Sequence, residues 1–65
     1  MNEELISMFR LAFAQGKYEK SLELAKKALE EDNWSADAHQ CAGNAYMSKA
    51  DYESAIEHYK KALDI

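Results

Sequence analysis

Two histidines and one cysteine are the side chains of this sequence best suited to bind a metal or attack a substrate. His39 and Cys41 are two positions apart, so on a helix they point to different faces, and His58 lies far along the chain. A structural zinc site needs about four converging ligands, and the sequence has no Cys-x2-Cys or His-x3-His pair. We therefore expect neither a metal site nor a catalytic thiol.

The acidic residues and the glycines also lack a catalytic arrangement. The carboxylates fall mostly on helix faces expected to point outward, and no pair is isolated in an apolar setting that would separate two pKa values. Gly16 and Gly43 are single, so neither belongs to a glycine-rich loop that could hold a phosphate. The sequence thus predicts a protein that is not an enzyme and uses no cofactor.

Length and composition indicate one small globular domain. A chain of 65 residues buries only roughly 60% of the surface that it exposes when unfolded, and domains of this size usually need extra stabilisation. Hydrophobic residues make up 48% and charged residues 31%, which is typical of a folded protein. Cys41 is the only cysteine, so no disulfide can form within the chain, and we expect a reducing, cytoplasmic location.

The charge of the chain argues against two classes of partner. Twelve acidic residues oppose eight basic ones, for a net charge of −4, and no basic patch suits nucleic acids or acidic membranes. No uncharged stretch is long and apolar enough to span a bilayer. We therefore expect neither nucleic acid nor membrane as a partner.

The spacing of apolar residues predicts four helices, and the absence of proline leaves none of them interrupted. Asn2 is suited to cap the first helix, which the pair Gln15-Gly16 ends. The turn-forming residues 32–35 separate the middle two helices, and Ser35 is suited to cap the third. Residues 49–51 interrupt again, and loops this short make neighbouring helices antiparallel. The segments expected to be helical are residues 3–14, about 17–31, 36–48 and 52–63.

The chain resembles itself after a shift of 34 residues. This shift brings Tyr18-Glu19 onto Tyr52-Glu53, and Lys26-Lys27-Ala28-Leu29 onto Lys60-Lys61-Ala62-Leu63. Glu23 also falls on Glu57. Two unrelated amphipathic helices share alanines, lysines and leucines by chance, but they do not readily place aromatic, small and charged residues in one register. We infer an internal repeat.

The second half of the chain contains His39-x2-Ala42-Gly43-x2-Tyr46, followed by Ala55-x3-Tyr59. These segments resemble the signature of the tetratricopeptide repeat, Trp-x2-Leu-Gly-x2-Tyr and Ala-x3-Phe, and the chain ends before the proline of that signature. The resemblance implies an all-α fold in which two antiparallel helical hairpins stack as a short right-handed α-solenoid. It makes residues 1–65 a single domain, with a first repeat at 2–35 and a second at 36–65 that lacks its last residues.

The first repeat departs from the pattern in its first helix. Phe9 occupies the position of a small residue, and Ala12 occupies that of an aromatic one. In the second helix Ala25 stands where the repeat normally has an aromatic residue. We therefore expect a size exchange, in which the ring of Phe9 faces Ala25.

Small residues and tyrosines are expected to pack the repeats together. Two helices approach closely only where side chains are small, and tyrosines then fill the space around the crossing with their hydroxyls near water. By the resemblance, His58 falls at a position that usually faces outward. The residues expected to pack the repeats are Tyr18, Ser21, Ala28, Gly43, Tyr46, Tyr52, Ala55, Tyr59 and Ala62.

The resemblance also implies a concave groove, lined by the first helix of each repeat, that receives a peptide or a helix. Asn44 matches a residue that chaperone-tail-binding members use to hold a peptide backbone. The lysine and the paired asparagine of a carboxylate-clamping groove are replaced by Ile6, Arg10 and Cys41, which argues against an acidic C-terminal tail. An apolar or amphipathic partner suits this surface better, although the same side chains could equally be partly buried packing residues. The residues expected to line the groove are Ile6, Arg10, Phe13, Gln40, Asn44 and Met47.

The two ends of the array predict self-association. The first helix is apolar on more than one face, and no polar helix covers the last repeat after Ile65. Repeat arrays generally need three or more units for stability. Asn33 stands where the family usually has a proline, so the second and third helices could fuse and exchange hairpins in a domain swap. The chemistry of residues 32–35 favours a turn instead.

Taken together, these patterns predict a protein–protein interaction scaffold that binds a peptide or helix of a partner through its groove. The alternative is a structural, self-assembling helical oligomer, and a weaker one is a helical fragment of an enzyme. The sequence identifies neither the partner nor the size of an oligomer, and it leaves open whether the chain is part of a longer array.

Overall fold

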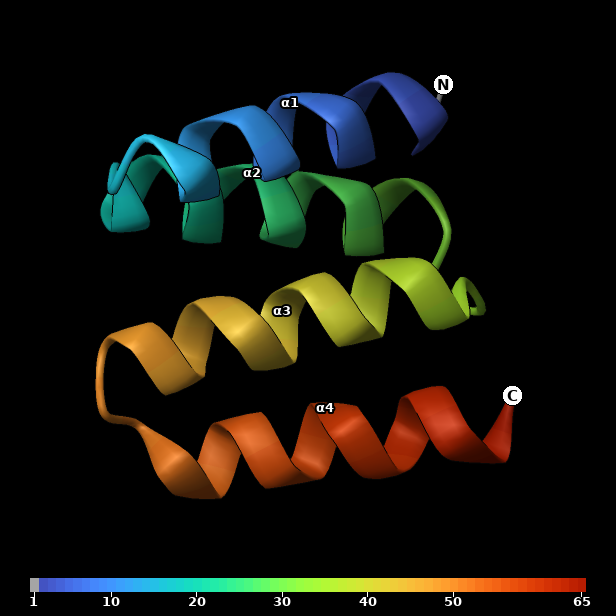
Figure 1. The fold of residues 1–65 in the computed structure, drawn as a ribbon. Coiled ribbons are helices and arrows are strands. Elements are labelled where there is room, and N and C mark those ends of the chain that lie inside the picture. Colours follow the sequence, from blue (N-terminus) through green and yellow to red (C-terminus); the bar gives the residue numbers. More distant parts are fainter. Residues whose placement is uncertain (1) are drawn as a thin grey trace.

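The structure of the protein is a computed structural model that describes residues 2–65, without the side chain of Asn2. Four helices follow one another as α1 (Asn2–Ala14), α2 (Tyr18–Glu31), α3 (Ala36–Ser48) and α4 (Tyr52–Asp64). They form two antiparallel hairpins lying one above the other, with α1 and α4 at the two ends of the stack (Figure 1). The prediction of an all-α fold is confirmed. The predicted capping role of Asn2 falls on a side chain outside the described part.

Each helix ends where the local sequence provides a turn. Gly16 has a φ of +78°, and the backbone N–H of Lys17 donates to the carbonyl of Ala12 at 2.9 Å, which closes α1. Between α2 and α3, the backbone N–H of Trp34 donates to the carboxylate of Asp32 at 3.0 Å. The hydroxyl of Ser35 accepts from the N–H of Ala38 at 3.1 Å, so the predicted cap of α3 is confirmed. In this single chain, α2 and α3 are therefore separated by a turn and are not fused.

The second hairpin turns at an alanine. Ala50 has a φ of 66°, in the left-handed region that favours glycine, and 34 positions earlier Gly16 occupies the same place in the first hairpin. The carboxylate of Asp51 then caps α4 by accepting from the backbone N–H of Ser54 at 3.3 Å and from its hydroxyl at 2.9 Å.

The core lies between the hairpins and is made largely of small residues. The helices pack as α1 on α2, α2 on α3 and α3 on α4, with a smaller contact between α1 and α3. Phe9 and Ala25, the pair expected to exchange sizes, are both buried in this one cluster. Because most of the other core positions are alanines, the helices can approach one another closely. The buried apolar residues are Ile6, Phe9, Ala12, Leu24, Ala25, Ala28, Ala38, Cys41, Ala42, Ala45 and Ala55.

Most of the residues expected to pack the repeats lie inside the stack, and two do not. Ser21, Ala28 and Ala55 have no exposed surface, Gly43 is buried, and Tyr46, Tyr59 and Ala62 are partly buried. Tyr18 and Tyr52, in contrast, are 42% and 58% exposed. Each tyrosine is the first residue of its helix, at the edge of the stack. For Tyr52 there is a second reason: within residues 2–65, α4 packs only on α3, so the outer side of α4 is uncovered.

Candidate protein-binding groove

Two adjoining hollows lie along α1 and α3. One, of about 540 Å³, lies beside the first turns of both helices, and the other, of about 310 Å³, lies further along them. Arg10 and Asp37 line both hollows, so the two are parts of one surface, which we name the α1–α3 groove. It is formed by the first helix of each hairpin.

The structure brings four of the six expected groove residues together. Arg10, Phe13, Gln40 and Asn44 all line the 310 Å³ hollow. Ile6 lines the 540 Å³ hollow but is only 6% exposed, so most of its side chain belongs to the core.

Met47 stands apart from the other expected groove residues. It is 43% exposed and lines neither hollow of the groove.

Aromatic rings form the apolar wall of the groove. The half-buried ring of Phe13 stacks on that of Phe9 with their centroids 5.4 Å apart. The ring of Tyr18 meets Phe13 edge-on at 5.3 Å. Because its neighbours hold it on two sides, Phe13 offers a fixed aromatic surface to a bound side chain.

Carboxylates gather at the wider end of the groove, where the sequence alone had indicated none. Glu3 of α1, Asp32 of the α2–α3 turn and Asp37 of α3 line the 540 Å³ hollow, and Arg10 is the one cation among its described lining residues. Two of these acids carry a helical signal that could have identified them. Glu3 precedes Ile6 by three residues, and Asp37 precedes Gln40 by three, so each shares a helix face with an expected groove residue. Asp32 carries no such signal because it belongs to a turn.

Asn44 is held in place by a residue from the neighbouring helix. The hydroxyl of Tyr59 on α4 donates to the side-chain oxygen of Asn44. With the oxygen occupied, the amide nitrogen is the group that Asn44 can offer to a carbonyl in the groove.

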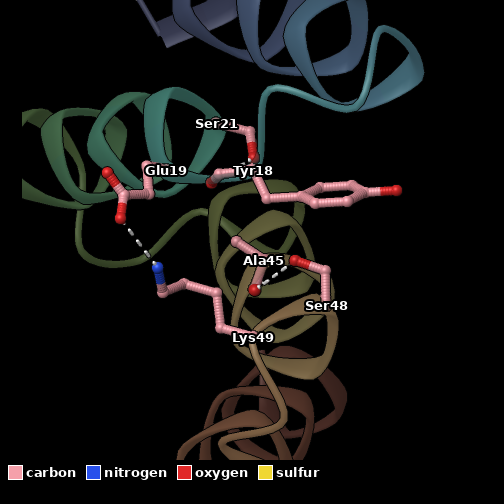
Figure 2. Close-up of polar contacts among 6 residues, drawn as sticks. All are labelled: Tyr18, Glu19, Ser21, Ala45, Ser48 and Lys49. Atoms are coloured by element: carbon pink, nitrogen blue, oxygen red, sulfur yellow. Dashed lines mark hydrogen bonds and ion pairs between the residues drawn. The ribbon is translucent and has the colours of Figure 1, made fainter.

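One ion pair joins the two hairpins away from the groove, and two hydrogen bonds within helices lie near that pair (Figure 2). The ammonium of Lys49, at the end of α3, lies 3.5 Å from the carboxylate of Glu19 on α2. The hydroxyl of Ser48 donates to the carbonyl of Ala45 at 2.7 Å, and that of Ser21 donates to the carbonyl of Tyr18 at 2.8 Å. These last two bonds satisfy hydroxyl groups at the junction of the hairpins.

Comparison with known protein families assigns the chain. The family model described as tetratricopeptide repeat matches residues 12–65, which cover α2, α3 and α4 and the end of α1. The chain belongs to the tetratricopeptide repeat family. This family generally mediates protein–protein interactions, and its repeats are typically non-catalytic modules. No curated protein matches the sequence closely enough to count as a relative. Over residues 2–65, no helix has both the length and the apolar character needed to cross a membrane.

Cys41 of α3 lines the groove as a buried thiol. Cys41 is 5% exposed and is a free cysteine. Burial raises the pKa of its thiol, as does the carboxylate of Asp37, while Arg10 opposes the shift. The thiol therefore stays protonated at neutral pH, which makes it a poor nucleophile and a neutral part of the groove wall.

The histidines of α3 and α4 contact each other, which sequence spacing did not reveal. Nδ1 of His39 lies 3.1 Å from Nδ1 of His58, and Nε2 of His39 lies 2.8 Å from the carbonyl oxygen of Asn33. A carbonyl can only accept, so Nε2 of His39 carries a proton. In the neutral pair, Nδ1 of His39 therefore accepts and Nδ1 of His58 donates.

The expectation that His58 faces outward is therefore wrong. Its ring is partly buried and stacks on Tyr46 at 5.5 Å and on His39 at 5.3 Å. Packing of α3 on α4 turns this position toward α3, a rotation that one helix alone does not fix. Burial lowers the pKa of His58, and the positive charges of His39 and Lys61 add to this effect, against the carboxylate of Glu57. In the described part of the chain, no three metal-binding side chains come together.

Proposed function

We propose that this chain is a protein-interaction scaffold whose α1–α3 groove binds an amphipathic, basic segment of a partner protein. The observation that carries this proposal is that one groove holds both the aromatic wall at Phe13 and a group of three carboxylates. The carboxylates come from α1, the α2–α3 turn and α3, and Asp37 lines the hollow of Phe13 as well. An aliphatic or aromatic side chain of the partner fits against Phe13, and a lysine or arginine fits beside Asp37.

The polar residues of the narrower hollow give the bound segment its register. The amide nitrogen of Asn44 donates to a backbone carbonyl of the partner, and Gln40, one turn earlier on the same helix face, offers a second amide. Among the described residues that line the groove, Arg10 is the one cation, and it limits how many basic side chains the wider end accepts. Ile6 supports this surface from beneath, and Met47, one helical turn beyond Asn44, lies outside both hollows.

The proposed scaffold is a single domain with a first repeat at residues 2–35 and a second at 36–65. We place it in the cytoplasm, since Cys41 is a free thiol that suits a reducing compartment. No chemistry is assigned to it, because the protonated Cys41 and the paired histidines offer no activated nucleophile.

Selection of peptides on the folded chain tests this proposal. From a random-peptide library, we expect enrichment of sequences that combine lysine or arginine with an aromatic or large aliphatic residue. Asp37→Lys should remove the basic preference, whereas Glu23→Lys, the same charge change at an exposed position of α2 outside both hollows, should leave it. Enrichment of acidic peptides, or an equal effect of the two variants, contradicts the proposal.

A second candidate function is self-assembly, which the exposed apolar residues at both ends of the stack favour. Met8 and Leu11 on α1 are 49% and 62% exposed, and Ile56 and Leu63 on α4 are 51% and 87% exposed. We propose that copies of the chain associate through these residues. A domain swap through a fused α2 and α3 is the other route to an oligomer, and the capped turn at residues 32–35 opposes it.

A further inference from the structure

The internal repeat supplies a template for the two uncovered ends. Within one chain, α3 of the second hairpin packs on α2 of the first. A shift of 34 residues relates α1 to α3 and α2 to α4. In the α2–α3 contact, one side of α2 is covered by one side of α3. By the shift, the outer side of α4 is equivalent to that side of α2. One side of α1 is likewise equivalent to the side of α3 that covers α2.

On the α3 side of this contact, the repeat relates buried alanines to exposed large residues. Ala42 and Ala45 have no exposed surface in the stack. Their equivalents 34 positions earlier are Met8 and Leu11, which are 49% and 62% exposed. The face of α1 that carries Met8 and Leu11 is thus placed like the face of α3 that docks on the hairpin before it.

On the α2 side, the repeat relates partly buried leucines to exposed residues 34 positions later. Leu22 and Leu29 are partly buried and pack against the core. Their equivalents 34 positions later are Ile56 and Leu63, which are 51% and 87% exposed. The outer face of α4 is thus placed like the face of α2 on which the following hairpin packs.

We infer that two copies of this chain associate head to tail, with the Met8–Leu11 face of α1 docking on the Ile56–Leu63 face of α4. The partner is a second copy because the two exposed faces correspond to the two sides of the α2–α3 contact within the chain. The α1 face corresponds to the α3 side of that contact, and the α4 face corresponds to the α2 side. This inference gives a geometry to the self-association proposed above. It leaves the α1–α3 groove unoccupied, because Phe13, Gln40 and Asn44 belong to neither face.

The docking face of α1 is hollowed and carries nearby cations. Met8, Leu11 and Leu24 line a hollow of about 110 Å³, with Lys17 and Lys20 also on its wall. An aliphatic side chain from the outer face of α4 fills such a hollow, and the basic groups beside it attract the acidic first turn of α4 at Glu53.

The contact between copies is looser than its internal template. Met8 and Leu11 are larger than the alanines that they replace, so the helices stand further apart. Gln15 occupies the place of Lys49, so the ion pair that Lys49 makes with Glu19 becomes a contact between Gln15 and Glu53. The two docking faces differ, so every assembly of copies still exposes one α1 face and one α4 face at its ends. Association is therefore open-ended and does not stop at a dimer.

Sedimentation of the 65-residue chain over a wide range of concentrations tests this inference with two blocked variants. Leu11→Glu blocks the α1 face and Leu63→Glu blocks the α4 face, and both positions are more than half exposed, so the fold tolerates the change. We expect the mean mass of the unmodified chain to rise beyond that of a dimer. Each variant alone should be monomeric, with association at least tenfold weaker. Their equimolar mixture should form a dimer and nothing larger, because only one pair of intact faces remains.

Controls separate this geometry from the other ways of associating. Met47→Glu makes the same change on α3 and should associate like the unmodified chain, while Gln15→Lys should strengthen association by restoring the ion pair. If Leu11→Glu fails to fold by circular dichroism, Met8→Glu replaces it. A monomeric unmodified chain overturns the inference, as does a mixture that stays monomeric. Undiminished association of the Leu63→Glu variant, as expected of a domain swap, also overturns it. Peptide binding in the groove is measured separately and stands or falls on its own.

Discussion

The ring of Tyr59 occupies the space in which a side chain at Gly43 would begin. A Cβ atom at Gly43 would lie 2.5 Å from Cε1 and 2.7 Å from Cδ1 of that ring. The hydroxyl of the same tyrosine donates to Asn44, the next residue of α3. One side chain of α4 thus sets both how closely the helices of the second hairpin approach and how a groove residue is oriented.

We expect Gly43→Ala to destabilise the protein by about 1–3 kcal/mol, because the ring of Tyr59 has to move aside within a packed hairpin. Alanine favours a helix over glycine by roughly 1 kcal/mol, so a net loss means that the steric effect dominates. The free energy of unfolding from urea titration, followed by circular dichroism, measures it.

The matched control replaces the ring of Tyr59, the side chain that lies against Gly43, with leucine. In a Tyr59→Leu background, Gly43→Ala should cost less than in the unmodified chain, because the ring that it meets is gone. Equal costs in both backgrounds would show that Tyr59 is not the obstacle.

Tyr59→Phe removes one hydrogen bond and keeps the ring. We expect it to lower the free energy of unfolding by only about 0.5–1.5 kcal/mol and to weaken a groove-binding peptide more than this loss suggests, because Asn44 is no longer oriented. Titration calorimetry with a selected peptide measures the affinity, and Tyr46→Phe serves as a control with no bond to Asn44. An unchanged affinity contradicts the role assigned to Asn44.

Gly16 and Ala50 occupy equivalent turns, and both have a positive φ. Gly16→Ala should cost roughly 1 kcal/mol, since an L side chain is strained there even though nothing lies within 4 Å of it. Ala50→Gly should stabilise the protein by about 0.5–1 kcal/mol, the relief of strain being partly offset by the greater freedom of glycine in the unfolded chain. Thermal unfolding of the two single variants compares them, and shifts of the same sign would contradict this assignment.

Much of the fold can be predicted from the sequence because its signals are local. Gly16 and the capping Ser35 mark helix ends through groups that lie within a few residues, and the 34-residue period follows from direct comparison of the chain with itself. The exposure of Tyr52 could not be predicted, since residue type does not say whether another helix covers it. The contact of His39 with His58 depends on how α3 and α4 are rotated against each other.

The candidate site is predicted less completely than the fold. Phe13 and Asn44 follow from the repeat pattern and do line the groove. Its acidic end, in contrast, combines Glu3, Asp32 and Asp37 from α1, a turn and α3, and only the packing of these elements brings them together.

The burial of the His58 ring predicts a loss of stability at mildly acidic pH. Folding lowers the pKa of His58 below its ordinary value of 6.5, so on acidification the unfolded chain binds this proton first. The stability is therefore complete above about pH 6.5 and declines as the pH falls toward the lower pKa of the folded state.

Urea unfolding at pH 7.5 and pH 5.5 measures this dependence. In the His58→Gln variant, the difference between the two pH values should shrink, because ordinary carboxylates titrate at lower pH. A pH dependence as steep in the variant as in the unmodified chain would assign the effect to other groups.

The central claim is that the α1–α3 groove binds a basic amphipathic segment, and it is tested most directly by NMR titration of the labelled chain with a selected peptide. We predict that the largest amide shifts map to Arg10, Phe13, Gln40 and Asn44, with smaller ones at Asp37, and that they saturate at one peptide per chain. Shifts concentrated on α4 and the outer face of α1, with those four residues unperturbed, would contradict the claim.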